Sequence, residues 1–295
     1  MSTVGAPTTR TDQRPDQSRG QIVEAVRRVP PTRWPLYALA GLLTFFLLFP
    51  IYLITVAAFS PRAALFAFPK LLLPTEISTE TLLFFLGSRG VLSSAWNSVL
   101  VGLLTLVLSL VIGTPAGYAL ARYAFRGRDA FQVLILTTRA FPIVILAVPL
   151  AVSFIQWGLY DTIFAVALVH TALALPTTVL ITSSIFVAVP RDVEEAALTL
   201  GCTPLGAFVR VALPLALPGL AAASLFTFVM SWNEVFAATI LTVANRTLPA
   251  QVFGSLSDSP LPYRFAGGFA LIVPSLVFIF FIRHYLFNMW GRVTR

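Results

Sequence analysis

Acidic side chains are scarce in this chain, and three of its twelve acidic residues, Asp192, Glu194 and Glu195, fall within four positions. They open the polar segment DVEEAALTLGCTPLGAFVRVALP, which separates two strongly apolar stretches. A connection between two helices needs only a few residues, so this segment has a purpose beyond joining its neighbours. Because carboxylates form strong pairs with basic groups, the segment 190–214 is a candidate docking site for another protein.

A second polar group, Trp232, Asn233 and Glu234, lies near the end of a later apolar stretch. An acid within or near a membrane is a functional candidate, and these residues could line a path for a solute. Trp also anchors helices at membrane surfaces, with a neighbouring acid in water. Both interpretations of this group stay open.

Catalytic and metal-binding sets are not found in the sequence. The single cysteine, Cys202, excludes an internal disulfide framework and a multi-cysteine metal site, and two histidines make a histidine-rich centre improbable. The phosphate-binding pattern GxxxxGK[ST] does not occur, so this chain does not bind ATP in that way. We expect no cofactor, no metal and no enzymatic activity in this chain itself.

The composition indicates that lipid is the solvent of most of this chain. Hydrophobic residues make up 57% and charged residues 11%, and the mean hydropathy is +0.86. Soluble domains are about half apolar and about one quarter charged. The net charge of +8 fits basic cytoplasmic loops better than nucleic-acid binding.

The apolar residues form six blocks, each long enough to cross a hydrocarbon core of about 30 Å as a helix. The blocks are 34–59, 97–121, 131–155, 162–189, 215–241 and 266–287. Residues 1–33 are polar and rich in Pro, Thr, Gln and Arg, which predicts a disordered tail before a membrane domain over 34–295.

The distribution of basic residues predicts the orientation. With the N-terminus inside, cytoplasmic segments hold fourteen arginines, and the opposite segments hold five basic residues. Basic residues favour the cytoplasmic side. We therefore expect six spans with both termini in the cytoplasm, and the segment 190–214 facing the cytoplasm.

Turn residues in this segment predict a cytoplasmic helix–turn–helix between spans four and five. Gly201 suits the left-handed position after the first helix, Thr203 caps the second, and Pro214 lies just past its end. Each helix has one apolar stripe, formed by Val193, Ala196, Ala197 and Leu200 and by Leu205, Phe208, Val209 and Ala212. Glu195 points nearly opposite the first stripe, and acidic residues argue against a hairpin that lies on anionic lipid.

Three features inside the spans predict contacts between helices. Gly113 and Gly117 form a GxxxG pattern, which allows close helix packing. His170 is expected to hydrogen-bond between helices. Arg139 lies inside the third block, where snorkelling or an interhelical bond is favoured over solute binding.

The spacing of Glu195-Ala196-Ala197, Gly201, Val211 and Leu213-Pro214 resembles the EAA motif of binding-protein-dependent ABC importer permeases. Val211 replaces the usual Ile of the motif. The segments PAGYALARYAFRGRD, WGLYDTIFAV and SWNEVFAATIL are similar to the carbohydrate-uptake, MalG-like branch of that family. The resemblance runs from about residue 35 to residue 290.

This resemblance implies a permease subunit of a prokaryotic plasma or inner membrane. Its partners would be a second permease, two ATP-binding cassette ATPase subunits and an extracytoplasmic solute-binding protein, with a sugar as the solute. The residues that the resemblance assigns to ATPase coupling are Glu194, Glu195, Ala196, Ala197, Gly201, Leu213 and Pro214. By this resemblance, Glu195 would bind a basic residue of the ATPase.

Other functions remain as alternatives. An ABC importer for glycerol phosphate, a polyamine or an anion would share the same motif. An ion-coupled secondary transporter would require inverted repeats and paired intramembrane charges, whereas charges in these spans are sparse. A membrane-embedded enzyme would require a nucleophile, base or metal set inside the spans, and none is found.

Overall fold

The computed structural model describes residues 34–68, 72–73, 76–255 and 258–290, with side chains as far as Phe281 in the last helix. Within these ranges the chain is helical and has no strand. The predicted tail, 1–33, lies outside the described residues. Helices that are long and apolar enough to cross a membrane are α2 (Trp34–Ala58), α5 (Val91–Arg122), α8 (Ile163–Ala188), the run Pro204–Asn233 that ends in α11 (Leu213–Asn233), and α14 (Leu261–Trp290).

The chain divides into two compact units, Met1–Ile51 and Tyr52–Arg295. The described part of the first unit is the beginning of α2, whose apolar side chains are largely exposed. Among the described residues, the second unit holds every other helix and all residues of the candidate sites. Large exposed apolar side chains on a helix of this length are expected where lipid is the solvent.

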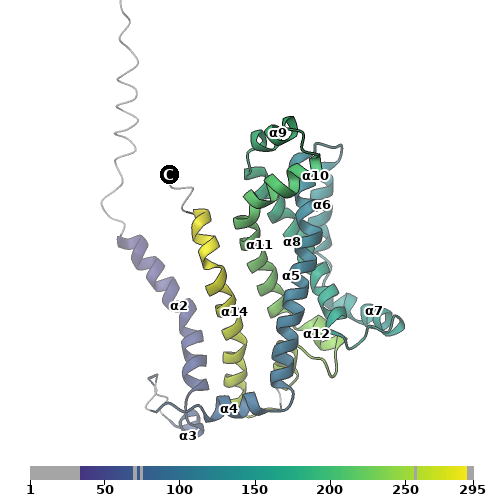
Figure 1. The fold of residues 1–295 in the computed structure, drawn as a ribbon. Helices are drawn as coiled ribbons and strands as arrows, with labels where there is room; N and C mark the ends of the chain where they lie inside the picture. The colour runs from purple at the N-terminus through teal and green to yellow at the C-terminus, as the bar shows by residue number, and fades with distance from the viewer. Residues whose placement is uncertain (1–33, 69–71, 74–75, 256–257, 291–295) are drawn as a thin grey trace, which may run out of the picture. The chain divides into compact units, whose positions relative to one another are not determined.

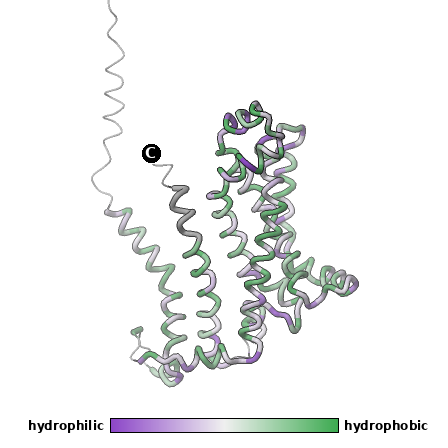
Figure 2. The backbone as a smooth tube through the Cα atoms, viewed as in Figure 1, coloured by the Kyte–Doolittle hydropathy of each residue, from purple (hydrophilic) through white to green (hydrophobic). Residues whose placement is uncertain are grey.

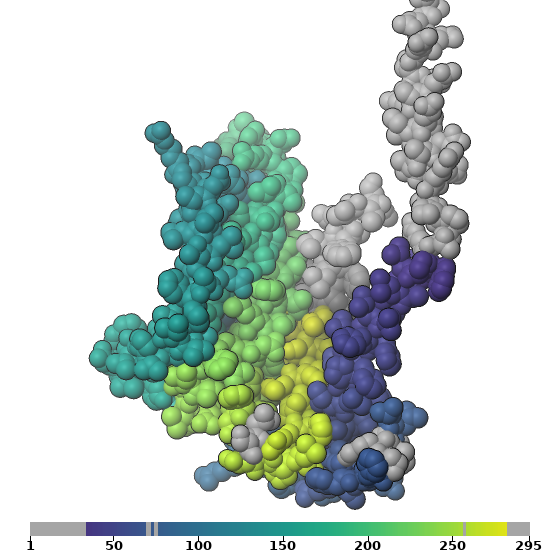
Figure 3. All heavy atoms as spheres, turned by 180° about the vertical axis from the view of Figure 1, so that it is seen from behind, coloured from purple at the N-terminus to yellow at the C-terminus, as the bar shows by residue number. Residues whose placement is uncertain are grey.

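The third apolar block is broken, which differs from the predicted continuous helix over 131–155. Helices α6 (Arg128–Thr138) and α7 (Ile143–Gln156) meet at 82° and make a sixth candidate span when they are counted together. Pro142 lies at the break; a proline disfavours helical backbone in the residue before it and lacks an N–H of its own. Helix α7 projects sideways from the long helices (Figure 1), and the same projection is visible from behind (Figure 3). Arg139 is exposed at this break.

The centre of the second unit is formed by α5, α8 and α11, and the most extensive contact is between α5 and α8. A Cβ atom added to Gly113 would lie 2.9 Å from Thr178, and one added to Gly117 would lie 2.1 Å from Thr182. Thr182 also donates a hydrogen bond to the carbonyl of Gly113 at 3.0 Å. The close packing that the GxxxG pattern predicts is confirmed.

Short helices complete the second unit. They are α3 (Arg62–Phe66), α4 (Glu80–Gly87), α9 (Arg191–Thr199), α10 (Pro204–Ala207), α12 (Phe236–Leu241) and α13 (Leu248–Ser255). Helices α9 and α10 lie at one end of the long helices, and α4 and α12 lie toward the other (Figure 1). Hydrophilic residues gather around α9, while the long helices are mostly apolar (Figure 2).

Candidate functional site

Helix α9 and the turn after it have the backbone geometry that the sequence predicts. The helix covers Arg191–Thr199, and Gly201 has a φ of +91°, a conformation that L side chains rarely adopt. The hydroxyl of Thr203 then accepts a hydrogen bond from the N–H of Gly206 at 3.1 Å, and Pro204 takes the first helical position. A rigid turn therefore connects α9 to α10.

The face of α9 that packs inward differs from the predicted apolar stripe. Glu194 is the residue of α9 that is buried, whereas Val193 and Leu200 are 45% and 86% exposed. The helix is turned so that Glu194 reaches basic and hydroxyl groups of α5, and this contact outweighs burial of the stripe. Glu195 is exposed, and Ala196 beside it is exposed too.

Glu194 forms a buried ion pair with Arg122, the last residue of α5. Nε of Arg122 lies 2.9 Å from Oε1 of Glu194, and Nη2 donates to the same oxygen. The hydroxyl of Tyr118 donates to Oε2 at 2.8 Å. Both charged side chains are 8% exposed, so three donors satisfy a carboxylate that has left water.

Arg122 also ties this pair to α8. Its Nη2 donates to the carbonyl of Val189, directly after α8, at 2.9 Å. Arg191 makes a return contact, with Nη2 donating to the carbonyl of Ala121 at 3.1 Å. Tyr118 and Arg122 were not predicted as site residues, although their spacing of four residues places both on one face of a helix.

The second helix of the segment does not end before Pro214. After α10 the chain passes through one turn of π-helix, Phe208–Ala212, called the π-turn below, and continues directly into α11. The expectation of a separate helix that stops at Pro214 is therefore wrong. Leu213 and Pro214 occupy the first turn of α11.

Trp232, Asn233 and Glu234 stand at the other end of α11, and their side chains have different environments. Trp232 is 2% exposed and donates from Nε1 to the carbonyl of Leu271 at 3.0 Å. Asn233 is exposed and donates to the carbonyl of Val229 at 2.8 Å. Trp232 therefore packs α11 against α14, while Asn233 offers a polar surface.

Glu234 lies in the break between α11 and α12, and its carboxylate bonds α12 and α8. Its carboxylate accepts hydrogen bonds from the N–H of Ala237 at 3.0 and 3.1 Å, which caps α12. Oε2 also lies 3.0 Å from Nε2 of His170 on α8, and Nδ1 of His170 lies 2.8 Å from Oγ of Ser231. The interhelical hydrogen bond that was expected of His170 is confirmed.

A family model described as binding-protein-dependent transport system inner membrane component matches residues 113–289, more than half of the chain. The chain belongs to this family. The matched region includes α9, the buried cluster of Tyr118, Arg122 and Glu194, and the break at Glu234. Among the described residues of this transport component, no three His, Cys, Asp or Glu side chains gather closely enough to hold a metal ion.

Several curated proteins resemble this inner membrane component. It is 31% identical to the arabinooligosaccharides transport system permease protein AraQ of Halalkalibacterium halodurans, over 87% of this chain and 94% of that protein. It is 34% identical to the trehalose transport system permease protein SugB of Mycobacterium tuberculosis, over 63% of this chain and 70% of that protein.

Solved structures give the same family. One is a bacterial ABC transporter involved in the import of the acidic polysaccharide alginate, with a TM-score of 0.65, 25% identity and coverage of 95% of this chain and 99% of that chain. This component is therefore a multi-pass membrane protein with the fold of an ABC importer permease.

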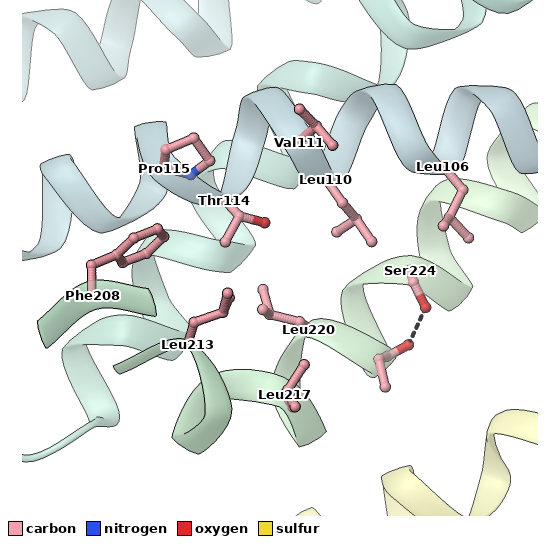
Figure 4. Close-up of a pocket in the computed structure, with 11 residues that line it drawn as sticks. Leu106, Leu110, Val111, Thr114, Pro115, Phe208, Leu213, Leu217, Leu220 and Ser224 are labelled. Carbon is pink, nitrogen blue, oxygen red and sulfur yellow. Dashed lines mark hydrogen bonds between the residues drawn. The ribbon is translucent and has the colours of Figure 1, made fainter. Parts of the chain in front are cut away.

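Two cavities border the residues that the sequence singled out. One, of about 460 Å³, is lined by Asn233 and Glu234 together with apolar residues of α11 and α12. The other, of about 710 Å³, lies between α5 and α11 (Figure 4), where Leu110 and Val111 face Leu213 and Leu217. The lining of the first cavity includes an amide and a carboxylate, and the second has a mainly apolar lining.

Asp161, in the loop between α7 and α8, bonds the segment after α12 at the end of the long helices opposite α9. Its Oδ1 accepts hydrogen bonds from the N–H groups of Val243, Asn245 and Ala244 at 2.8, 3.0 and 3.1 Å. Burial alone would raise the pKa of Asp161, but these N–H groups and the nearby Arg246 hold the pKa below the ordinary value of 3.8. The charged carboxylate therefore joins the α7–α8 loop to the segment after α12.

Proposed function

We propose that this chain is a permease subunit of an ABC importer for a sugar, and that the sugar is a disaccharide or a short oligosaccharide. The supporting observation is the similarity to AraQ along nearly the whole of both chains. The permease relatives SugB and DasC, the latter of Streptomyces coelicolor, are named for transport of trehalose and diacetylchitobiose. In this proposal a second permease completes the path, an extracytoplasmic binding protein delivers the sugar, and two ATPase subunits supply the energy.

Helix α9 is the proposed docking element for an ATPase subunit, on the cytoplasmic side of a chain whose termini are both cytoplasmic. Exposure of Val193 and Leu200 supports this assignment, because apolar side chains outside the membrane are covered when a partner binds. Glu195 would pair with a basic residue of the ATPase, and Ala196 and Ala197 would permit close approach. Gly201 would set the angle to α10.

The outer part of the solute path is proposed to run past Asn233 and Glu234, with Trp232 holding α11 in place behind them. The cavity of about 460 Å³ beside these two residues supports this position. Amide and carboxylate oxygens suit the hydroxyl groups of a sugar. Asn233→Ala should lower uptake while the ATPase subunits stay bound.

Reconstitution of the complete complex in proteoliposomes tests the substrate class. We expect ATP-dependent uptake of one of trehalose, diacetylchitobiose or an arabinooligosaccharide, measured with labelled sugars. Glycerol phosphate, spermidine and sulfate serve as the alternative solutes. Uptake of one of these alternatives, with no uptake of any sugar, would overturn the proposal.

Two variants test docking through α9. Glu195→Lys reverses the exposed charge, and Gly201→Val forces a β-branched residue into positive φ. Both should insert into the membrane normally and lose ATPase subunits on purification, or keep them and lose uptake. Thr199→Ser retains the hydroxyl that bonds the carbonyl of Ala196 and should be near neutral. Full uptake in both test variants would show that α9 is not the docking element.

A further inference from the structure

We propose that the buried cluster of Tyr118, Arg122 and Glu194 is the link that carries movement of α9 into the membrane helices. This inference rests on the proposed function, in which α9 receives the ATPase. It assigns Glu194 to the interior of this subunit rather than to the surface that meets the partner. The three residues are positioning residues, because none of them touches the solute or the nucleotide.

Helix α9 has few polar attachments to the bundle. In the described part of the chain, its side-chain hydrogen bonds to other elements come from Arg191 and Glu194 alone. The neighbouring acids Asp192 and Glu195 face outward. Helix α9 also packs against α10 and against Phe208–Ala212. Beside this packing and the chain itself, Glu194 and Arg191 are the side chains whose hydrogen bonds carry a force on the exposed face of α9 to the membrane helices.

The cluster is also stiff. The carboxylate of Glu194 receives hydrogen bonds from Arg122 and from Tyr118, and both charged side chains are 8% exposed. Ion pairs in such surroundings are strengthened by the low local dielectric and are poorly screened by salt. A guanidinium also presents its donors in a fixed plane, so the pair resists both separation and rotation.

From Arg122 the cluster connects to two membrane helices. Arg122 bonds the carbonyl of Val189, so one side chain joins the ends of α5 and α8. Those two helices are locked together further along by Gly113 and Thr182. On α5, Thr105 lies 17 residues before Arg122, or about 26 Å along the helix, and it receives a hydrogen bond from Ser231 at 3.4 Å. Movement at Arg122 is thereby transmitted as movement of a pair of helices toward the end of α11.

The experiment uses the whole complex in proteoliposomes and measures three quantities: retained ATPase subunits, ATP hydrolysis and sugar uptake. Glu194→Gln and Arg122→Gln each break the ion pair. We expect each variant to keep the ATPase subunits within about twofold of wild type. Uptake per ATP hydrolysed should fall at least about tenfold, and stimulation of hydrolysis by the loaded binding protein should be lost.

The double variant Glu194→Gln, Arg122→Gln tests whether the two residues act through each other. If they form one link, the double variant loses about as much uptake per ATP as either single variant, because the second change removes nothing further. If the two residues act independently, the fold-loss of uptake per ATP in the double variant is the product of the two single losses. Tyr118→Phe removes one of the donors and should give a smaller loss than Glu194→Gln.

Matched controls come from the same elements. Ser184→Ala removes an exposed hydroxyl of α8, and Tyr123→Phe removes an exposed hydroxyl one residue after α5. Both should transport as wild type. A proportional loss of ATPase subunits and uptake in Glu194→Gln, at unchanged uptake per ATP, would make the cluster a brace of the fold and overturn the inference.

Failure of the link and failure of docking on α9 give different results. Normal uptake per ATP in Glu194→Gln, together with loss of ATPase subunits in Glu195→Lys, would overturn the link and leave docking on α9 intact. Normal uptake in Glu194→Gln, Glu195→Lys and Gly201→Val would overturn docking on α9 as well. Loss of coupling in Glu194→Gln with retained subunits supports both.

Discussion

Nε2 of His170 lies 3.0 Å from Oε2 of Glu234, so a residue of α8 holds the break between α11 and α12. The other ring nitrogen reaches Ser231 one turn earlier on α11, at 2.8 Å. The carboxylate of Glu234 is occupied at the same time by the N–H of Ala237. One buried imidazole thus fixes both the last turn of α11 and the start of α12.

His170→Leu should therefore destabilise the subunit. Ser231 and Glu234 would each lose one hydrogen bond and keep others, and a hydrogen bond contributes about 0.5–1.5 kcal/mol net. Thermal unfolding of the purified complex measures the loss. His170→Gln can keep one of the two hydrogen bonds and should lose less. Ser184→Ala, on the exposed face of the same helix, should be neutral; equal midpoints for His170→Leu and wild type would contradict this role.

Gly117→Ala should loosen the contact between α5 and α8. The added Cβ would lie 2.1 Å from Oγ1 of Thr182 and 2.7 Å from the backbone nitrogen of Ser183, and the backbone cannot move aside as a side chain can. Overpacking of this kind costs about 1–3 kcal/mol. Gly87→Ala is the matched control, because its Cβ would meet no atom within 4 Å. Equal melting of the two variants would show that α5 and α8 are not in close contact at Gly117.

Asp161→Asn should change how stability depends on pH. The lowered pKa means that the folded state binds the proton of Asp161 more weakly than the unfolded chain does. The stabilisation is therefore complete above the ordinary Asp pKa of 3.8 and is lost as the pH falls through the lower folded value. The melting midpoint of wild type should exceed that of Asp161→Asn at about pH 7, and the gap should narrow toward about pH 3. A difference in melting midpoint that does not change with pH would show that the charge of Asp161 does not stabilise the fold.

The proposed orientation can be tested with single cysteines in a Cys202→Ser background, since Cys202 is the one cysteine of the chain. Helices α4 and α9 lie at opposite ends of the long helices (Figure 1); Ser78 is two residues before α4, and Thr199 is the last residue of α9. A membrane-impermeant maleimide added outside intact cells should label Ser78→Cys and leave Thr199→Cys unlabelled. The reverse pattern would invert the topology.

Local features of the chain were predictable where neighbouring residues decide them. Gly201 and Thr203 adopt the turn and cap that their residue types favour, and Gly117 supports the close packing that its spacing indicates. Hydropathy also located the apolar blocks, because each helix must satisfy its backbone within the membrane. These features depend on residues only a few positions apart.

The inward face of α9 was not predictable in the same way. A helical period calculated over nine residues favours burial of Val193 and Leu200, whereas the partner that turns the helix, Arg122, is 72 residues before Glu194. Adjacent residues differ by about 100° around a helix, so exchanging the roles of Glu194 and Glu195 changes the whole face. The break near Pro142 was missed for a related reason: hydropathy measures apolar length and not direction.

The π-turn at Phe208–Ala212 affects how this chain tolerates changes in length. The N–H of Leu213 donates to the carbonyl of Phe208, five residues earlier, where an α-helix would use the carbonyl four residues earlier. The turn has therefore absorbed one surplus residue without rotating the helix after it. Deleting Val209 should give an uninterrupted helix with α10 and α11 in their present orientations. A deletion of one residue within α11, after the turn, would instead rotate every later side chain by about 100°.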